Sequence, residues 1–558
     1  MPEFFRKRSW ETDVRILFWT IGPILAAVLA YTTRYFINGD AIAYIQMGDA
    51  LRHGQLWGLA NLTYSPGYPA LLALGQILLN TSPLNELETL RIVNFFCFLL
   101  AMGSCELFMM FCKREATAIS GSNETLLPRP IMSLLCYSTF LLAALVWIKV
   151  QLLNPDMLVM ALMLTGAALV LWIREDPAIH KYIFLGACCG IGYYLKSFFF
   201  IFSSVFFLLA ALCARTYWKA LSRTAVAVLV MLLVASPLIA ALSHKLGRFT
   251  YGELGKQAYA YFISGTGKPF RPKLIDERTQ TFFYPGGDPG ARQCDMCYWQ
   301  EGIVPKFDLK AHAKVFLHNL IDAFSQLPFI FLVVAWYIVQ VRLCSYSFAS
   351  SRPPSFYLIL AFISLAGVGF YTLIHVETRY IAGALFIGFA TLVMSIRSPV
   401  RADWRALMPS ILFLCILWPH LIYAGVDQSL RSLRSTPKKP SYKECYLELH
   451  AVKNFVLSNG LKQGDETAIL GEPPVYWARF AGVRITAEIQ APGEFMAIGE
   501  KQRKRILEKL DDQGIEAVVG RGDSLDGLVR EGWRHVVGTQ HYYVKFFHPI
   551  HQGDSQKR

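Results

Sequence analysis

The sequence has 558 residues, of which 54% are hydrophobic and 14% aromatic. A soluble protein of this length would not be so apolar throughout, and apolar stretches of about 18–25 residues, each long enough to cross a bilayer, recur along the chain. The formal net charge of +14 does not indicate a nucleic-acid partner, because many basic residues lie in short loops between apolar stretches, where they set membrane topology. We therefore predict a polytopic α-helical membrane protein with a small soluble α/β domain at its carboxyl end.

The first apolar stretch, residues 16–33, follows several basic residues and has no cleavable signal pattern. It is typical of a retained signal anchor, with the amino terminus in the cytoplasm. The chain would then emerge on the outer side of the membrane directly before Asn38.

The stretch from Asn38 to Pro69 does not have the pattern of a simple loop. Small and apolar residues recur at helical spacing after Asp40, which predicts an amphipathic helix on the membrane surface. Asp40 and Tyr44 share a face of that helix, whereas Asp49 is about half a turn out of phase. A carboxylate held against a membrane is costly, which favours a functional site. The alternative is that Asn38 or Asp40 only caps a surface helix.

Together with the first stretch, the apolar stretches predict about eleven membrane crossings with juxtamembrane helices on the outer side. The short apolar stretch Pro66–Leu79 is predicted as a half-buried helix on the outer surface, because counting it as a crossing would turn several basic loops outward. A long outer loop covers 243–313, too long for a mere connector. The predicted crossings are 16–33, 93–112, 131–150, 157–173, 181–195, 198–213, 225–242, about 314–341, 357–374, 381–396 and 411–423.

The chain divides at a linker rich in Pro and Lys, which predicts a transmembrane domain over 1–435 and an extracytoplasmic α/β accessory domain over 436–558. Strand-like and helix-like segments alternate after the linker. No Gly-rich phosphate loop occurs there, since Gly520–Arg521–Gly522 lacks the further glycines and the Lys-Ser/Thr end of such a loop. We assign this domain no chemistry of its own.

The cysteines give little evidence for a metal. Eight of the twelve lie within apolar stretches, where cysteine is usually a small core residue. Cys294 and Cys297 form a lone CxxC in the long outer loop. One such pair is weak evidence for zinc, which takes four ligands, so a local disulfide is favoured over a metal site, with two free thiols as the alternative.

Polar side chains gather in four short clusters at the outer ends of predicted crossings: Asp40–Tyr44, Asn154–Asp156, Lys196 and His375–Tyr380. Topology places them in one layer. Each has a structural alternative: a helix cap for Asn154–Asp156, snorkelling to the interface for Lys196, and a local ion pair at a helix start for Glu377 and Arg379.

One chemistry accounts for the four clusters together. A carboxylate in a membrane-facing cavity can act as general base on an acceptor hydroxyl. Lysine and arginine at the same level can hold the phosphate of a polyprenyl-phosphate sugar and stabilise it as it leaves. A lipid-borne donor would explain why no nucleotide-binding loop is present.

The motifs resemble those of the GT-C membrane glycosyltransferases, in particular the branch of the protein O-mannosyltransferases and lipid A aminoarabinose transferases. The resemblance covers about three quarters of the chain and rests on short motifs in matching order: Asp40 with Tyr44, SPGYP at Ser65–Pro69, NPD at Asn154–Asp156, YLKS at Tyr194–Ser197 and HVETRY at His375–Tyr380.

The resemblance implies transfer of a hexosyl or pentosyl unit from a polyprenyl-phosphate donor to a hydroxyl on the extracytoplasmic side. Asp40 would be the catalytic base or would orient the acceptor, and Asp156 would be a second catalytic acid residue. The implied donor-binding residues are Lys196, Arg379, Tyr44, His375, Glu377 and Tyr380. Ala41 stands where many family members have a second acid, and this loop has no acidic pair with metal-binding spacing. A divalent metal is therefore possible as a cofactor but is not supported by a motif, and no metal ligand is assigned.

Two other classes of protein remain possible from the sequence. A transporter or flippase of lipid-linked sugars would also place charges near crossings, although no inverted repeat is visible. A polysaccharide polymerase or ligase would use similar donors, although the outer loop is mixed in charge. The sugar and the acceptor (a protein, a lipid or a glycan) are not specified. The compact tail and the lack of an endoplasmic-reticulum retrieval signal favour a bacterial inner membrane, with the site facing the periplasm.

Overall fold

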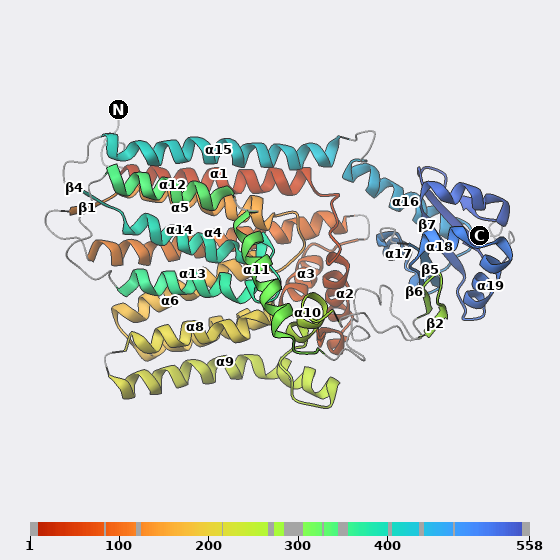
Figure 1. Cartoon of the computed structure of the whole chain (residues 1–558), viewed down its shortest axis with the longest axis horizontal. Helices are drawn as coiled ribbons and strands as arrows, with labels where there is room; N and C mark the ends of the chain where they lie inside the picture. The colour runs from red at the N-terminus through yellow and green to blue at the C-terminus, as the bar shows by residue number, and fades with distance from the viewer. Residues whose placement is uncertain are drawn as a thin grey trace.

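The computed structural model describes residues 9–82, 85–118, 124–214, 216–265, 273–283, 305–325, 328–343, 355–399, 404–434, 440–471 and 475–548. A bundle of long helices fills most of the molecule, and a sheet formed mainly by the C-terminal residues lies beyond one end of the bundle (Figure 1). The short helices α2 and α3 lie at that same end.

Seven helices in the described part of the chain are long and apolar enough to cross a membrane, and the count rises to eight if a pair bent by 65°, α11 (Leu309–Ser325) and α12 (Pro328–Leu343), forms one span. The protein is therefore a multi-pass membrane protein. The seven are α1 (Trp10–Thr32), α4 (Glu86–Ala118), α5 (Arg129–Leu142) with its continuation η3 (Ala143–Ile148), α6 (Asp156–Glu175), α9 (Tyr217–Leu246), α14 (Thr378–Ser395) and α15 (Trp404–Leu433).

The other predicted crossings are also helices, but shorter ones. These are α7 (Ile179–Leu195), α8 (Phe198–Leu212) and α13 (Ser355–Thr372), of which α7 packs on α6 and α9, and α13 packs on α14. Each predicted crossing thus corresponds to a helix or helix pair of the bundle. The count of eleven membrane spans stays a prediction, because length and composition identify seven or eight.

Helix α2 (Ala41–Arg52) packs on α3 (Gly67–Leu78), with the short 3-10 helix η2 (Leu56–Leu59) between them in the chain. With 12 residues, α3 is too short to cross a bilayer. Tyr68 and Leu72 are buried, while Ile77 and Leu78 on the other side are exposed apolar residues. An apolar exposed face of this kind fits the predicted half-buried helix on a membrane surface.

The sheet has seven strands in the order β2-β3-β6-β5-β7-β9-β8. Strands β5, β6 and β7 pair in parallel, and the others pair antiparallel. Helices α16 (Tyr442–Ser458), α17 (Tyr476–Ala481), α18 (Pro492–Ala497) and α19 (Glu500–Asp511) and the 3-10 helix η5 (Asp523–Glu531) accompany it. The strands are β2 (Lys273–Asp276), β3 (Thr281–Phe283), β5 (Glu466–Leu470), β6 (Arg484–Ile489), β7 (Ala517–Arg521), β8 (Arg534–His535) and β9 (Tyr542–Phe546).

Two of these strands come from the long loop predicted over 243–313. After helix α10 (Leu254–Phe262), that loop supplies β2 and β3, and β3 pairs with β6. The sheet therefore includes residues on both sides of the boundary predicted at residue 436, and the two-domain division stays a prediction. A separate two-stranded sheet, β1 (Glu124–Leu126) with β4 (Arg397–Pro399), lies at the opposite end of the bundle (Figure 1).

The Gly67 of the SPGYP motif has a packing role. A Cβ atom on Gly67 would lie 2.7 Å from the carbonyl oxygen of Tyr194 and 3.0 Å from its carbonyl carbon, two residues before Lys196. Glycine therefore lets the start of α3 approach the end of α7 at a backbone-to-backbone contact. This contact joins two of the sequence motifs in space.

We expect Gly67→Ala to lower the free energy of unfolding by about 1–3 kcal/mol, because the backbone of Tyr194 must move to make room. Thermal unfolding of the purified protein in detergent measures this. Gly103→Ala in α4 is the matched control, since a Cβ there meets no atom within 4 Å. Equal unfolding midpoints for the two variants would contradict the packing role.

Candidate active site

The four polar clusters predicted from the sequence meet at the end of the bundle next to α2. They line a small cavity of about 180 Å³, between the start of α2, the start of α6, the turn between α7 and α8, and the start of α14. The candidate residues in its wall are Asp40, Tyr44, Asp156, Lys196, Arg379 and Tyr380. His375 and Glu377 line an adjoining larger cavity.

Asp156 is at the electrostatic centre of this site. Its side chain is only 4% exposed, and its Oδ1 atom accepts a hydrogen bond from Nζ of Lys196 at 2.8 Å. Its Oδ2 atom lies 3.6 Å from Nε of Arg379. Asn154 lies one residue before Pro155, the N-cap residue of α6, and its side-chain oxygen accepts from the backbone N–H of Asp156 at 3.1 Å. Asn154 therefore hydrogen-bonds to the start of α6 without being its N-cap, whereas Asp156 pairs with two cations.

Arg379 connects three carboxylates. Its Nε atom lies 2.6 Å from Glu377 Oε2, and its Nη2 atom lies 3.8 Å from Asp40 Oδ2. Nη2 also donates to the hydroxyl of Tyr380 at 3.1 Å. The predicted local ion pair with Glu377 is therefore present, but the same guanidinium also faces Asp40 and Asp156.

Asp40 is the most open carboxylate of the cluster, with 42% of its side chain exposed. It is the N-cap residue of α2 by position, yet its side chain makes no capping hydrogen bond. Its Oδ1 atom instead accepts a hydrogen bond from the hydroxyl of Tyr64 at 3.0 Å. The cap alternative does not describe this carboxylate, which faces the cavity and Arg379.

Lys196 does not snorkel away from the protein. Its Nζ atom lies over the ring of Tyr380, 3.6 Å from the centroid, in addition to its pairing with Asp156. Burial lowers the pKa of Lys196 from its ordinary value, and the nearby Asp156 carboxylate offsets part of this shift. Removal of that carboxylate would therefore favour the neutral amine.

The remaining predicted residues form the walls. The ring of His375 stacks on Phe262 of α10 at 4.1 Å, and its Nε2 atom lies 3.5 Å from Glu377. Burial alone would raise the pKa of Glu377, but hydrogen bonds from His375 and Arg379 lower it to about 2. A carboxylate with that pKa is a poor general base near neutral pH. Burial raises the pKa of Tyr44 well above its ordinary value, so its hydroxyl stays protonated.

Polar side chains to which the sequence assigned no role in the site fix its loops. Asn38 and Leu153 exchange two hydrogen bonds, at 3.3 and 2.9 Å, and so join the loop before Asp40 to the loop before Asp156. On α4, Asn94 donates to the carbonyls of residues 150 and 152, each at 2.8 Å, and Arg91 donates to the carbonyl of residue 151 at 2.6 Å. Their signal in the sequence is a polar residue at the start of an apolar stretch.

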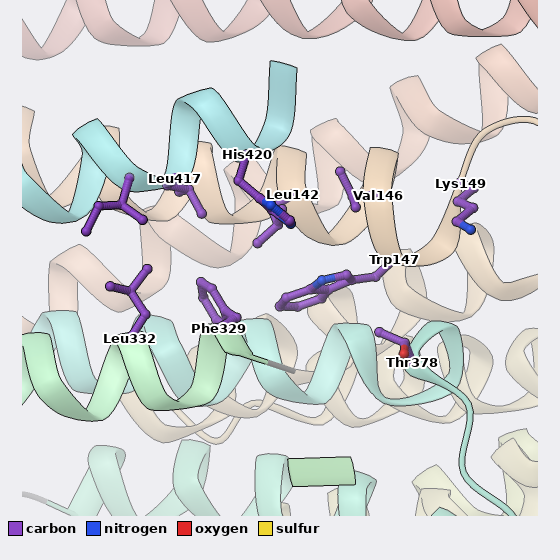
Figure 2. Close-up of a pocket in the computed structure, with 10 residues that line it drawn as sticks. Leu142, Val146, Trp147, Lys149, Phe329, Leu332, Thr378, Leu417 and His420 are labelled. Atoms are coloured by element: carbon purple, nitrogen blue, oxygen red, sulfur yellow. The ribbon is translucent and has the colours of Figure 1, made fainter. Parts of the chain in front are cut away.

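Two further cavities continue from the small one in series. A large cavity of about 840 Å³ shares Asp40 and Arg379 with it. A third cavity of about 450 Å³ runs between α5, α12, α14 and α15 and shares Trp147, Lys149 and Thr378 with the large one. Figure 2 shows that apolar side chains line most of this third cavity and that Lys149 lies at one end of it.

Lys149 follows η3 with a positive φ of 70°, an uncommon backbone conformation for a residue other than glycine. Such strained residues cluster at functional sites. It is a cation at the junction of an apolar cavity and a polar one. The sequence analysis missed it because a single lysine at the end of a crossing is not distinctive.

Among the described residues, no group of three or more His, Cys, Asp or Glu side chains is arranged to hold a metal ion. Cys294 and Cys297 lie outside the described residues.

No protein-family model matches the chain, and no curated protein matches it by sequence. Solved structures do match. The crystal structure of ArnT from Cupriavidus metallidurans bound to undecaprenyl phosphate aligns over 96% of this chain and 98% of that chain, with 13% identity and a TM-score of 0.55. Its apo state aligns over the same shares, with 13% identity and a TM-score of 0.54.

The oligosaccharyltransferase of Archaeoglobus fulgidus, in complex with Zn and sulfate, aligns over 90% of this chain and 68% of that chain, with 13% identity and a TM-score of 0.50. The chain thus shares the fold of these two proteins, in agreement with the GT-C-like arrangement that the motifs predicted. At this identity the likeness concerns the fold.

We expect Asp156→Asn to destabilise the protein by about 3–5 kcal/mol, because it leaves the buried cations Lys196 and Arg379 without their shared counter-charge. Asp40→Asn is the matched control, since Asp40 is open to the cavity and its amide replacement still accepts a hydrogen bond from Tyr64. Thermal unfolding in detergent compares the two. Similar midpoints would show that Asp156 does not hold the cations together.

Proposed function

We propose that this protein is an integral-membrane glycosyltransferase, which moves a sugar from a polyprenyl-phosphate donor to an acceptor hydroxyl on the extracytoplasmic side of the membrane. One observation carries the proposal: the open carboxylate of Asp40 faces Arg379 where a small charged cavity meets a larger one. That arrangement offers a base and a phosphate-binding cation within reach of one substrate. The shared fold with ArnT, solved with undecaprenyl phosphate, supports a donor of this class.

The cavities suit the parts of such a donor. The apolar cavity of Figure 2 provides a surface for isoprenoid units. Lys149, at one end of this cavity, also lines the large cavity. Arg379 lines both the large and the small cavity, so a phosphate between them would meet a planar guanidinium, with Lys196 behind it. The sugar would then lie beside Asp40.

The residues divide the chemistry between them. Asp40 takes the proton of the acceptor hydroxyl as its oxygen attacks the anomeric carbon of the sugar. The bond between that carbon and the phosphate oxygen breaks, and the polyprenyl phosphate leaves with the bonding electrons. Arg379 and Lys196 stabilise the charge that develops on the leaving phosphate. Tyr64 holds the Asp40 carboxylate in place through its hydroxyl.

Asp156 has a different part in this proposal from Asp40. Since it is buried and paired with both cations, it sets their positions and their charge rather than receiving the acceptor proton. Tyr44 and Tyr380 form the tyrosine wall of the small cavity, and His375 with Glu377 orients Arg379 from the large cavity. The transferred unit in this proposal is a hexosyl or pentosyl group, and the acceptor is a hydroxyl of a protein, a lipid or a glycan.

The experiment that tests the function reconstitutes the protein in vesicles with a pool of polyprenyl-phosphate sugars and bacterial envelope acceptors, read by mass spectrometry. Transfer of a sugar with release of polyprenyl phosphate supports the proposal. Movement of intact donor across the bilayer without transfer would instead identify a transporter or flippase. If neither transfer nor movement is detected, both functions are contradicted for these donors.

We expect Asp40→Asn to reduce turnover by about 10²–10⁴, because the amide cannot accept the proton, while the protein stays folded and still binds donor. Single-turnover kinetics with the donor identified above measures this. The control is Asp427→Asn on α15, whose carboxylate pairs with Arg431 on the same helix at 2.9 Å. Near-normal turnover of Asp40→Asn would remove Asp40 from the mechanism.

Asp49 is not a suitable control, although its helical phase turns it away from Asp40 as predicted. Its carboxylate binds Arg479 of α17, beside the C-terminal sheet, at 2.5 Å. A change at Asp49 therefore weakens a half-buried ion pair of its own.

A further inference from the structure

A cluster of charges outside the three cavities joins the C-terminal sheet to the end of the bundle that holds the candidate site. Arg479 on α17 donates two hydrogen bonds to Glu86, the first residue of α4, from Nε at 2.9 Å and from Nη2 at 2.6 Å. Its Nη1 atom donates to Asp49, in the last turn of α2, at 2.5 Å. The hydroxyl of Tyr476 donates to the same Glu86 carboxylate at 2.7 Å.

The cluster requires an arginine at position 479. The side chains of Arg479 and Glu86 are 17% and 8% exposed. Burial alone would lower the pKa of Arg479, but the hydrogen bond to Glu86 and the neighbouring carboxylates raise it, so the guanidinium remains charged. Its planar fork contacts two carboxylates on different helices at once, which a lysine ammonium cannot reproduce with the same geometry.

The two helices that Arg479 joins carry the two halves of the candidate site. Helix α2 begins directly after Asp40 and ends at the turn that holds Asp49, about 14 Å further along at 1.5 Å per residue. Helix α4 begins at Glu86, and its next turns hold the backbone of residues 150–152, directly before Asp156. The angle between α2 and α4 therefore influences the placement of Asp40 relative to Asp156.

The sheet is also connected along the chain to the other side of the cavities. Strand β3 pairs with β6 and belongs to the loop that follows α10. Helix α10 supplies Leu254 to the small cavity and Phe262 to the large one. Among the described residues, those that line the three cavities include none from the strands of this sheet. An effect of the sheet on the site therefore passes through other elements.

We propose that Arg479 is a positioning residue for the transfer reaction: by binding Glu86 and Asp49 together, it fixes α2 against α4 and so places Asp40 opposite Asp156 and Arg379. The proposal rests on the proposed function for its kinetic consequence. Its geometric consequence, the ordering of α2 and of the loop before Asp156, stands apart from any assay of transfer.

The test uses the full-length protein with Arg479→Lys, which keeps a cation near Glu86 and Asp49 but loses the fork. The matched control is Arg503→Lys. Arg503 on α19 makes the same two-point contact with Glu531 on η5, beside the C-terminal sheet and away from α2 and α4. Hydrogen exchange followed by mass spectrometry reports on residues 41–48 and 150–156. Transfer kinetics, measured at a temperature below the thermal unfolding midpoint of each variant, give the turnover and the KM for donor separately.

We expect Arg479→Lys to show several-fold faster exchange in both segments and a turnover about 10- to 100-fold lower, with the KM for donor within about twofold of wild type. Asp49→Asn removes the negative charge from the contact with α2 and leaves the contact with Glu86 on α4 intact, so exchange should rise in residues 41–48 and not in 150–156. Arg503→Lys should leave both segments and turnover unchanged.

The proposal would be overturned if residues 41–48 exchanged at the same rate in Arg479→Lys, Asp49→Asn and Arg503→Lys. It would also be overturned if Arg479→Lys lowered turnover by no more than it lowered the amount of folded protein. If the wild type transfers no sugar while Arg479→Lys and Asp49→Asn loosen their segments as expected, the proposed function fails and the positioning of α2 by Arg479 is upheld. If the Arg479→Lys variant does not fold, the exchange measurement on the Asp49→Asn variant tests the proposal.

Discussion

The candidate site depends on one buried carboxylate, Asp156, that holds two cations at the end of an apolar helix bundle. Lysine and arginine are costly to bury, and their cost falls when a shared counter-charge and hydrogen bonds accompany them. Asp156 supplies that charge to Lys196 at 2.8 Å and to Arg379 at 3.6 Å. Because α6, α14 and the turn between α7 and α8 each contribute one of these groups, the ion cluster also fixes how these elements meet.

This constraint separates two acidic roles that look alike in sequence. The buried aspartate keeps the cations charged and in place, whereas Asp40 is open, bound by the Tyr64 hydroxyl, and free of a capping role. A site that needs a base and a phosphate-binding cation must keep them close without letting the base be neutralised by a tight ion pair. The 3.8 Å separation of Asp40 from Arg379, longer than the 2.8 Å pair between Asp156 and Lys196, meets that requirement.

The sequence was sufficient to predict a polytopic helical protein and to place Asp40, Asp156, Lys196 and Arg379 in one layer at the outer ends of the crossings, because charged groups there are rare and the topology alternates. That they line one cavity follows from the fold alone. Lys149 could not be found in this way, since its significance comes from a cavity formed by four helices. The same holds for the contact of Arg479 with α2 and α4 and for the strands that the loop after α10 adds to the sheet, because both join segments far apart in the chain. No local pattern encodes such contacts.

The central claim is that Arg379 binds the phosphate of a lipid-linked donor beside Asp40. A cryo-electron microscopy structure of the protein in nanodiscs with undecaprenyl phosphate tests it most directly. The account predicts phosphate density within about 3 Å of the Arg379 guanidinium, with the lipid chain in the apolar cavity beside Trp147. Lipid bound with its phosphate away from Arg379, or a chain that leaves the apolar cavity empty, would contradict it.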